Sequence, residues 1–243
     1  MSNMTTADTS TLPLIGTRDW AAIENALDLR GYAVLPNLFT ESDCHRIIDL
    51  YEVKENFRSH IHMARHGFGK GEYRYLKYPL PDLVRDTRKT IYPFLADIAN
   101  RWNTHMNISR RYPSTHEDLI SECHAAGQVR PTPLIFQYVP GDYNCLHQDL
   151  YGDIYFPLQV AVLLSEPGQD FLGGEFILTE LKHGKQSCAE VIHLKKGDAV
   201  IFAVCHRPNQ GSRRKGKINM RHGVSRVRSG RRHTLGIIFH DAR

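Results

Sequence analysis

The stretch YVPGDYNCLHQDLYGD, residues 138–153, places a histidine and an aspartate two positions apart, between a Pro-Gly turn and a long apolar run. Side chains two apart in extended chain point to the same face, so His147 and Asp149 are able to reach one metal ion. The tripeptide alone is weak, because the chain holds 14 histidines and 26 acidic residues and repeats the pattern at His116 and Asp118. That second copy follows Pro-Ser-Thr with no apolar strand after it, and it predicts a helix start.

Downstream of residue 131 the sequence predicts closely spaced β-strands. Pro-Gly, Gly-Gly and Lys-Gly-Asp turns separate short β-rich segments, with no helical pattern between them. Six or more such strands predict a sandwich or jelly roll, so we expect a double-stranded β-helix core over residues 131–243. The segments are LIFQYV, LQVAVLLS, GEFILTE, AEVIHL, DAVIFAV and HTLGIIF.

Upstream, the sequence predicts helices packed outside this core. Thr17 is expected to cap a first helix that ends at Gly31, and YAVLP then predicts a short strand. Thr40 to Asp43 resembles a capping box that opens a second helix. Residues 53–78 show no clean period, and the sequence leaves their role open. We expect one domain over residues 1–243, in which residues 1–130 form a helical support and lid region. The apolar positions are Trp20, Ile23 and Leu27 in the first helix, Cys44, Ile47, Ile48 and Tyr51 in the second, and Val84, Ile91, Leu95, Ile98 and Trp102 in a third.

Composition indicates a soluble globular protein in a reducing compartment. The chain has 243 residues, 41% of them hydrophobic and 23% charged, which is typical of a domain with a sizeable core. The segment MSNMTTADTSTLPLIG lacks the layout of a signal peptide, and no apolar run approaches the roughly 18 residues of a membrane span. Five scattered cysteines without a C-x-x-C pair indicate free thiols. We expect a cytoplasmic protein with no membrane partner.

A third metal ligand should come from a distant strand, and His222 is the favoured candidate. Arg232 follows it ten positions later on the next predicted strand, where a guanidinium suits a dicarboxylate. Two imidazoles and one carboxylate on iron leave positions open for a cosubstrate and oxygen. His206, just past DAVIFAV, stays an alternative that lacks an arginine on a following strand. The histidines considered are His183, His193, His206, His222, His233 and His240.

The sequence resembles the 2-oxoglutarate and Fe(II)-dependent dioxygenases, in their prolyl-hydroxylase-like branch. Four blocks carry the likeness in family order over roughly residues 134–240: YVPGDYNCLHQD, FLGGEFIL, KKGDAVIF and HGVSRVRSGRRHTLGIIF. The segment LRGYAVLPNLFTESDCHRII looks like the start of the family fold. The stretch also resembles a small bacterial family of such oxygenases predicted to act on nucleic acids.

The resemblance implies iron at His147, Asp149 and His222, and 2-oxoglutarate held by Arg232. In the family, 2-oxoglutarate is oxidised to succinate as molecular oxygen is consumed and a substrate carbon is hydroxylated, and no catalytic side chain is expected beyond the metal centre. Arg231 competes with Arg232, because adjacent strand residues face opposite ways. The family arrangement G-x-R-[YH]-x-L matches residues 230–235 and favours Arg232. Two tyrosines near the metal pair, Tyr138 and Tyr143, are candidates either for holding the cosubstrate or for the core.

Charge points to a polyanionic substrate. Residues 207–243 hold eleven of the 31 Lys/Arg and one of the 26 Asp/Glu, which leaves 20 basic and 25 acidic residues before them. The insert RPNQGSRRKGKINMR, residues 207–221, is expected beside the site, and residues 58–78 mix cations with aromatic residues, as suits stacked bases and tracked phosphates. The alternative is a solvated basic face. The candidate substrate-binding residues are Arg213, Arg214, Lys215, Lys217, Arg74 and Phe68.

Three functions remain open from the sequence. The first is an oxygenase acting on a nucleic-acid base, DNA rather than RNA, that removes alkyl lesions in DNA repair from a base flipped into the pocket. The second hydroxylates a protein side chain such as proline, or a small molecule. The third is a non-catalytic β-barrel module that binds metal or nucleic acid. Known nucleic-acid dealkylases of the superfamily show a second arginine shortly after the first, whereas this chain has none between Arg232 and Arg243.

Overall fold

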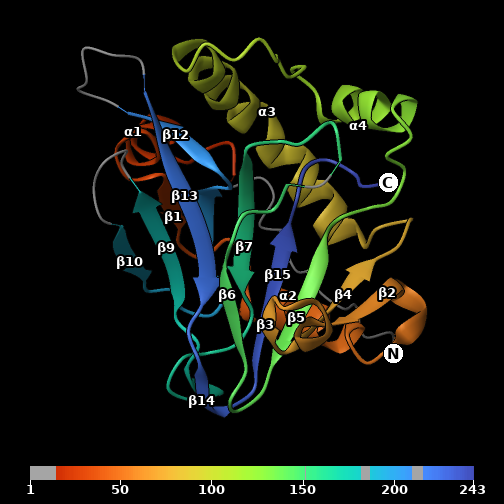
Figure 1. Cartoon of the computed structure of the whole chain (residues 1–243). Coiled ribbons are helices and arrows are strands. Elements are labelled where there is room, and N and C mark those ends of the chain that lie inside the picture. Colours follow the sequence, from red (N-terminus) through yellow and green to blue (C-terminus); the bar gives the residue numbers. More distant parts are fainter. Residues whose placement is uncertain (1–14, 151, 182–186, 210–215) are drawn as a thin grey trace, which may run out of the picture.

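The computed structural model describes residues 15–150, 152–181, 187–209 and 216–243, and it consists of two antiparallel sheets with helices outside them (Figure 1). The larger sheet has seven strands in the order β1-β11-β7-β15-β5-β4-β2. The smaller follows the order β10-β9-β13-β6-β3, with β12 also paired to β13, while β14 and β8 form a separate ribbon. The prediction of a mainly β jelly-roll fold with helices packed outside is confirmed.

The bounds of the elements follow chain order. The helices are α1 (Trp20–Arg30), α2 (Glu41–Leu50), α3 (Asp82–His105) and α4 (His116–Ala125), with short 3-10 helices at η2 (Lys54–Asn56) and η3 (Met63–His66). The strands are β1 (Tyr32–Leu35), β2 (Phe57–His62), β3 (Gly69–Lys70), β4 (Glu72–Leu76), β5 (Leu134–Tyr138), β6 (Tyr143–His147), β7 (Leu158–Leu163), β8 (Phe171–Gly173), β9 (Phe176–Leu181), β10 (Cys188–Ile192), β11 (Ala199–Ala203), β12 (His206–Pro208), β13 (Lys217–Val224), β14 (Val227–Gly230) and β15 (Arg232–Ile237).

Helix starts follow the capping rules, with one correction. Thr40 and Asp43 form the predicted capping box of α2, and Thr115 caps α4, so the second His-x-Asp pattern does start a helix. The prediction that Thr17 caps the first helix is wrong. Asp19 caps α1 instead, because its carboxylate accepts a hydrogen bond of 2.9 Å from the Ala22 amide.

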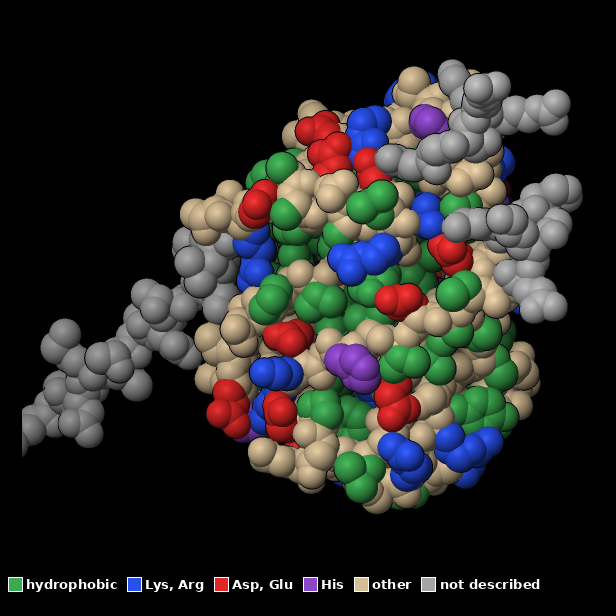
Figure 2. Space-filling view, turned by 90° about the vertical axis from the view of Figure 1, so that its left-hand side faces the viewer, with side chains coloured by type: hydrophobic (Ala, Val, Ile, Leu, Met, Phe, Trp, Pro, Cys, Tyr) green, Lys and Arg blue, Asp and Glu red, His purple; other side chains and the backbone are tan. Residues whose placement is uncertain are grey.

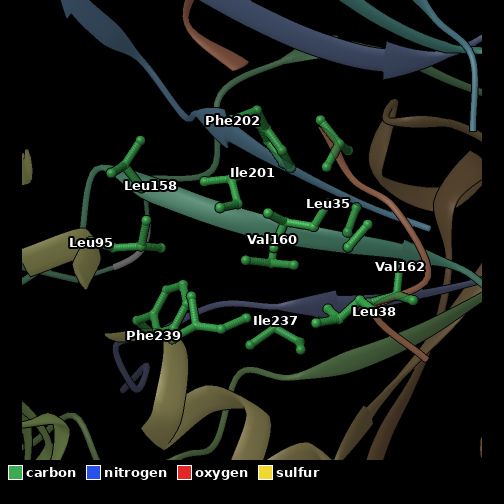
Figure 3. Close-up of a cluster of buried hydrophobic side chains, with 14 of the residues drawn as sticks. Leu35, Leu38, Leu95, Leu158, Val160, Val162, Ile201, Phe202, Ile237 and Phe239 are labelled. Atoms are coloured by element: carbon green, nitrogen blue, oxygen red, sulfur yellow. The ribbon is translucent and has the colours of Figure 1, made fainter. Parts of the chain in front are cut away.

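The central strands of the larger sheet are buried on both faces. All six residues of β7 are buried, because one face looks toward the smaller sheet and the other is covered by helical segments. Figure 3 shows side chains of β7, β11 and the C-terminal segment packed together, with Leu95 of α3 at one side of the cluster. This core fixes the frame on which the facing strands place their polar side chains.

Residues 53–78, where the sequence shows no clean period, contain three strands. Strands β2 and β4 extend the larger sheet beyond β5, and β3 pairs with β6 of the smaller sheet. The N-terminal part is therefore less purely helical than predicted, because β1 also joins this sheet beside β11. Since one sheet draws strands from both halves of the chain, we infer that the described residues form a single domain.

None of the helices in the described part of the chain has the length and apolar composition needed to cross a membrane.

Candidate active site

His147, Asp149 and His222 meet between the two sheets, as the sequence predicts. Strand β13 sets His222 directly opposite His147 at the end of β6. The Nε2 atoms of His147 and His222 each lie 3.3 Å from a different oxygen of Asp149. Two donors bound to one ion at about 2.1 Å stand roughly 3.0 to 3.4 Å apart, so this spacing fits a shared metal ion.

The protonation states of Asp149 and His222, and the tautomer of His147, also suit a metal. His147 Nδ1 lies 2.7 Å from the Cys145 carbonyl, so an Nδ1 proton is donated there and the Nε2 lone pair faces Asp149. Burial alone would raise the pKa of Asp149, but its interactions with the His147 and His222 imidazoles hold it well below its usual range. Burial lowers the pKa of His222. An ionised carboxylate beside a neutral imidazole is the form that ligates a cation.

Arg232 is buried in the same cavity and is 2% exposed. Among the described residues it forms no ion pair, although the charge of Glu175 acts on it from a longer distance. Its Nη1 donates a hydrogen bond of 2.6 Å to Thr234 Oγ1, while its Nε has no hydrogen-bond partner. Burial lowers the pKa of Arg232 to about 10. A buried guanidinium of this kind calls for an anionic ligand.

The cavity has a volume of about 140 Å³ and lies between the sheets. Three inward-facing residues of β5 and three of β15 form one wall, because alternate residues of a strand share a face. The metal triad and Asn144 form the opposite wall. The lining residues from β5 and β15 are Leu134, Phe136, Tyr138, Arg232, Thr234 and Gly236.

Gly174 makes room for the arginine. A Cβ atom at this position would lie 2.8 Å from Arg232 Cδ, and the backbone φ of +64° is one that L-residues rarely adopt. A side chain at the second glycine of the FLGGEFIL block would therefore collide with the candidate cosubstrate arginine, so this position requires glycine.

The structure separates the alternatives left open by the sequence. Arg231 is exposed, whereas Arg232 faces the cavity. His206 lies in a different hollow, beside Tyr155 and Cys205, and not with the triad. Tyr138 lines the cavity and is 1% exposed.

Several predicted residues lie away from the cavity. Tyr143 is not in its lining and instead packs beneath Arg226, whose Cζ is 4.6 Å from the ring centroid. Arg74 is turned to the other face of β4, where its Cζ lies 4.2 Å over Tyr51 and its Nη1 donates to the Tyr51 carbonyl. This packing places Arg74 away from the cavity, and its role in substrate binding stays a prediction.

Of the other candidate substrate-binding residues, one lines the cavity and one lies outside it. Phe68 is 47% exposed, lines the cavity and stacks on His66 with ring centroids 5.6 Å apart. Lys217 is exposed at the start of β13, outside the lining and five residues before His222. The three remaining cations of the insert, Arg213, Arg214 and Lys215, lie outside the described residues.

Sequence reasoning missed most of the residues that line the cavity, among them Tyr73, Phe136, Asn144 and Thr234. Alternation would have found two of them, since Phe136 shares a strand face with Tyr138, and Thr234 with Arg232. Tyr73 had no such signal, because β4 was not predicted.

Figure 2 shows the side of the molecule that lies at the left in Figure 1, with α1, β9 and β10. Among the coloured residues there, basic and acidic side chains are interspersed and separated by hydrophobic ones. On this face the described cations do not form one continuous patch.

Comparisons with known proteins agree on a family and a fold. Residues 71–242 match a family model, Oxygenase-NA, described as an oxygenase catalysing oxidative methylation of damaged DNA. An uncharacterised Mycobacterium tuberculosis protein is 41% identical over 164 residues, which cover 68% of this chain and 70% of that one.

Solved structures share the fold at low identity. A 2OG-Fe(II) oxygenase-family oxidoreductase of Burkholderia pseudomallei is 15% identical, with a TM-score of 0.53 and coverage of 93% of each chain. A Pseudomonas putida prolyl-4-hydroxylase is 14% identical, with a TM-score of 0.51 and coverage of 92% of this chain and 99% of that one. The chain belongs to the Oxygenase-NA family, so it is an oxygenase and hence an oxidoreductase.

Proposed function

We propose that the protein hydroxylates an alkyl carbon on a damaged nucleic-acid base, in DNA rather than RNA, with iron at His147, Asp149 and His222. The observation that carries the proposal is one cavity holding both the triad and the buried Arg232. The family description, which names damaged DNA, supports the substrate class.

Arg232 would hold the distal carboxylate of 2-oxoglutarate. A guanidinium and a carboxylate form charge-assisted hydrogen bonds, and the unpartnered Nε is a donor not already used. Thr234, whose hydroxyl accepts from Nη1, fixes the guanidinium, and Tyr138 lies opposite it across the strand pair. When bound, Fe(II) and 2-oxoglutarate supply oxygen activation coupled to oxidation of the cosubstrate to succinate.

The chain's own residues orient the reactants and exclude water. His147 is locked in its tautomer by the Cys145 carbonyl, and Asp149 stays ionised at neutral pH. Apolar side chains such as Phe136, Phe176 and Val224 line the rest of the cavity and keep it dry. A flipped base would enter past Phe68, whose exposed ring on His66 offers a stacking surface.

The free cysteines support a proposal for the cellular compartment of the protein. All five cysteines are free, three of them buried, which favours a reducing compartment and a cytoplasmic location.

A protein side-chain hydroxylase is the second candidate, and one observation favours it. Among the described residues, Arg232 is the single Lys or Arg in the cavity lining. Arg243, the next arginine in the sequence, pairs with Asp153 instead. A second pocket arginine for a phosphate or base is thus missing, whereas the apolar walls would accept a prolyl ring.

Succinate release with a panel of substrates tests the proposal. Oligonucleotides with N-methylated bases should stimulate succinate and formaldehyde release together, and matched unmethylated oligonucleotides should not. The His222→Ala variant is the background control. Any succinate that it releases comes from contaminating enzymes and is subtracted from the wild-type value. Stimulation by proline-containing peptides and not by methylated oligonucleotides would overturn the nucleic-acid assignment in favour of the protein hydroxylase.

A further inference from the structure

We infer that His60, His62 and Glu72 form a second metal site, on the outer face of the larger sheet, that takes one divalent transition-metal ion of the zinc type. His60 and His62 stand two apart on β2 and so share a face. Glu72 on β4 lies directly opposite His62 in the strand register. Each residue offers a ligand atom, and the three atoms lie within 4.8 Å of one another.

The distances fit one ion. Glu72 Oε2 lies 2.9 Å from His60 Nε2 and 3.7 Å from His62 Nδ1, and the two imidazole rings are 4.4 Å apart. Donors about 2.1 Å from a tetrahedral ion stand roughly 3.4 Å apart, which lies between the two observed distances. Two imidazoles and one carboxylate leave a fourth position for water, which is a donor set that zinc accepts.

Glu72 is held in place from behind. Its other oxygen, Oε1, accepts a hydrogen bond of 2.9 Å from the Tyr51 hydroxyl and one of 3.1 Å from Gln137 Nε2. Both donors bind the oxygen that does not face the histidines, so Oε2 is directed to His60 and His62. Hydrogen bonds to the non-ligating oxygen of a carboxylate orient it in metal sites. An exposed ion pair forms without such hydrogen bonds, so their presence favours a metal ligand.

The supporting residues form a row across the sheet. The register pairs His62 with Glu72, Glu72 with Gln137, and Gln137 with His233, over β2, β4, β5 and β15. His233 Nε2 lies 3.2 Å from Gln137 Oε1, which sets the orientation of that amide. The row ends one residue from Arg232.

The site is distinct from the active site but backs onto its wall. Tyr73, between Glu72 and Arg74, lines the cavity, so Glu72 faces the opposite side of the sheet. Strand β2 is the edge of the larger sheet. An ion joining β2 to β4 would therefore fasten the edge strand to the strand that carries Tyr73.

Metal binding without turnover tests this site independently of the oxygenase reaction. The tag-free His147→Ala/His222→Ala double variant lacks two of the three active-site donors. Titrated with Zn²⁺ alone and followed by calorimetry, it should bind one equivalent per chain. Adding His60→Ala, His62→Ala or Glu72→Ala should weaken that binding at least tenfold, and Tyr51→Phe by about tenfold. The matched control, His66→Ala, changes an exposed histidine of η3 outside the cluster and should leave affinity unchanged.

Absence of a stoichiometric zinc site in the double variant, or equal loss with His66→Ala and His60→Ala, would overturn the inference. If circular dichroism shows that the double variant does not fold, the test is made with the wild type instead. It should bind two equivalents of Co²⁺, and His60→Ala/His62→Ala should bind one. Two equivalents in that variant would equally contradict the site.

Discussion

Arg232 and Tyr138 stand directly opposite each other on β15 and β5, with the guanidinium carbon 5.5 Å from the centre of the phenol ring. Both side chains are almost fully buried. This pairing decides which face each side chain of the last strand points to, because a register that turns Arg232 inward turns Arg231 outward. The strand pairing, more than the local sequence, thus decides which of the two arginines faces the cavity.

Replacing Arg232 by Ala should raise the 2-oxoglutarate KM by about 30-fold or more. Loss of one partner of a buried charged pair costs about 2 to 5 kcal/mol, whereas Arg231→Ala removes only an exposed charge and should change the KM less than threefold. Succinate formation at varied 2-oxoglutarate measures both variants. A larger effect at Arg231 would reverse the proposed roles of the two arginines.

Gly174→Ala should lower stability and weaken 2-oxoglutarate binding together. The added methyl group would lie 2.8 Å from Arg232 Cδ, and the left-handed backbone itself costs about 1 to 3 kcal/mol. Gly168→Ala is the matched control, since its φ is +85° but nothing lies within 4 Å of the added carbon. Urea unfolding should show a loss for both variants, and the KM should rise only for Gly174→Ala. Equal KM values for the two would refute the steric role.

Buried His116 should make the fold sensitive to acid. Burial lowers the pKa of His116 to about 3, below the value of roughly 6.5 expected in the unfolded chain. The unfolded state therefore binds the proton first, so this contribution to stability is complete above about pH 6.5 and is lost as pH falls toward 3. Its slope approaches about 1.4 kcal/mol per pH unit.

Urea unfolding between pH 6 and pH 4.5 measures that slope. The His116→Gln variant should lose stability less steeply than the wild type, while His66→Gln, at an exposed position, should follow it. Parallel curves for wild type and His116→Gln would contradict the assignment.

Oligonucleotide affinity should depend on salt through the 207–221 insert. If about three of its cations meet single-strand phosphates, log affinity should fall with log salt at a slope of about −2. Changing Arg213, Arg214, Lys215 and Lys217 to Ser should flatten the slope and leave uncoupled 2-oxoglutarate turnover intact. A control changes four other exposed cations to Ser: Lys54, Lys77, Arg85 and Lys89. Fluorescence anisotropy that shows no salt dependence in the wild type would exclude the insert as a phosphate contact.

Much of the core and the triad could be predicted because local pattern and tertiary burial agree there. The apolar segments after residue 131 all form strands, of which β7 is fully buried, and His147 and Asp149 lie together as their spacing requires. Strand β2 could not be predicted, because it is an edge strand with a half-exposed, polar sequence and no apolar period. The local sequence around Arg74 did not reveal its position either, since its partner Tyr51 lies 23 residues away.

The most direct test of the account is the visible absorption of the protein mixed with Fe(II) and 2-oxoglutarate without oxygen. The wild type should show a metal-to-ligand charge-transfer band that neither component gives alone. The His147→Ala, Asp149→Ala and His222→Ala variants should each lose the band, because two remaining donors hold the ion too weakly in the required geometry. His206→Ala, in a separate hollow, should keep it. A band that survives in Asp149→Ala and His222→Ala but disappears in His206→Ala would contradict the proposed iron site.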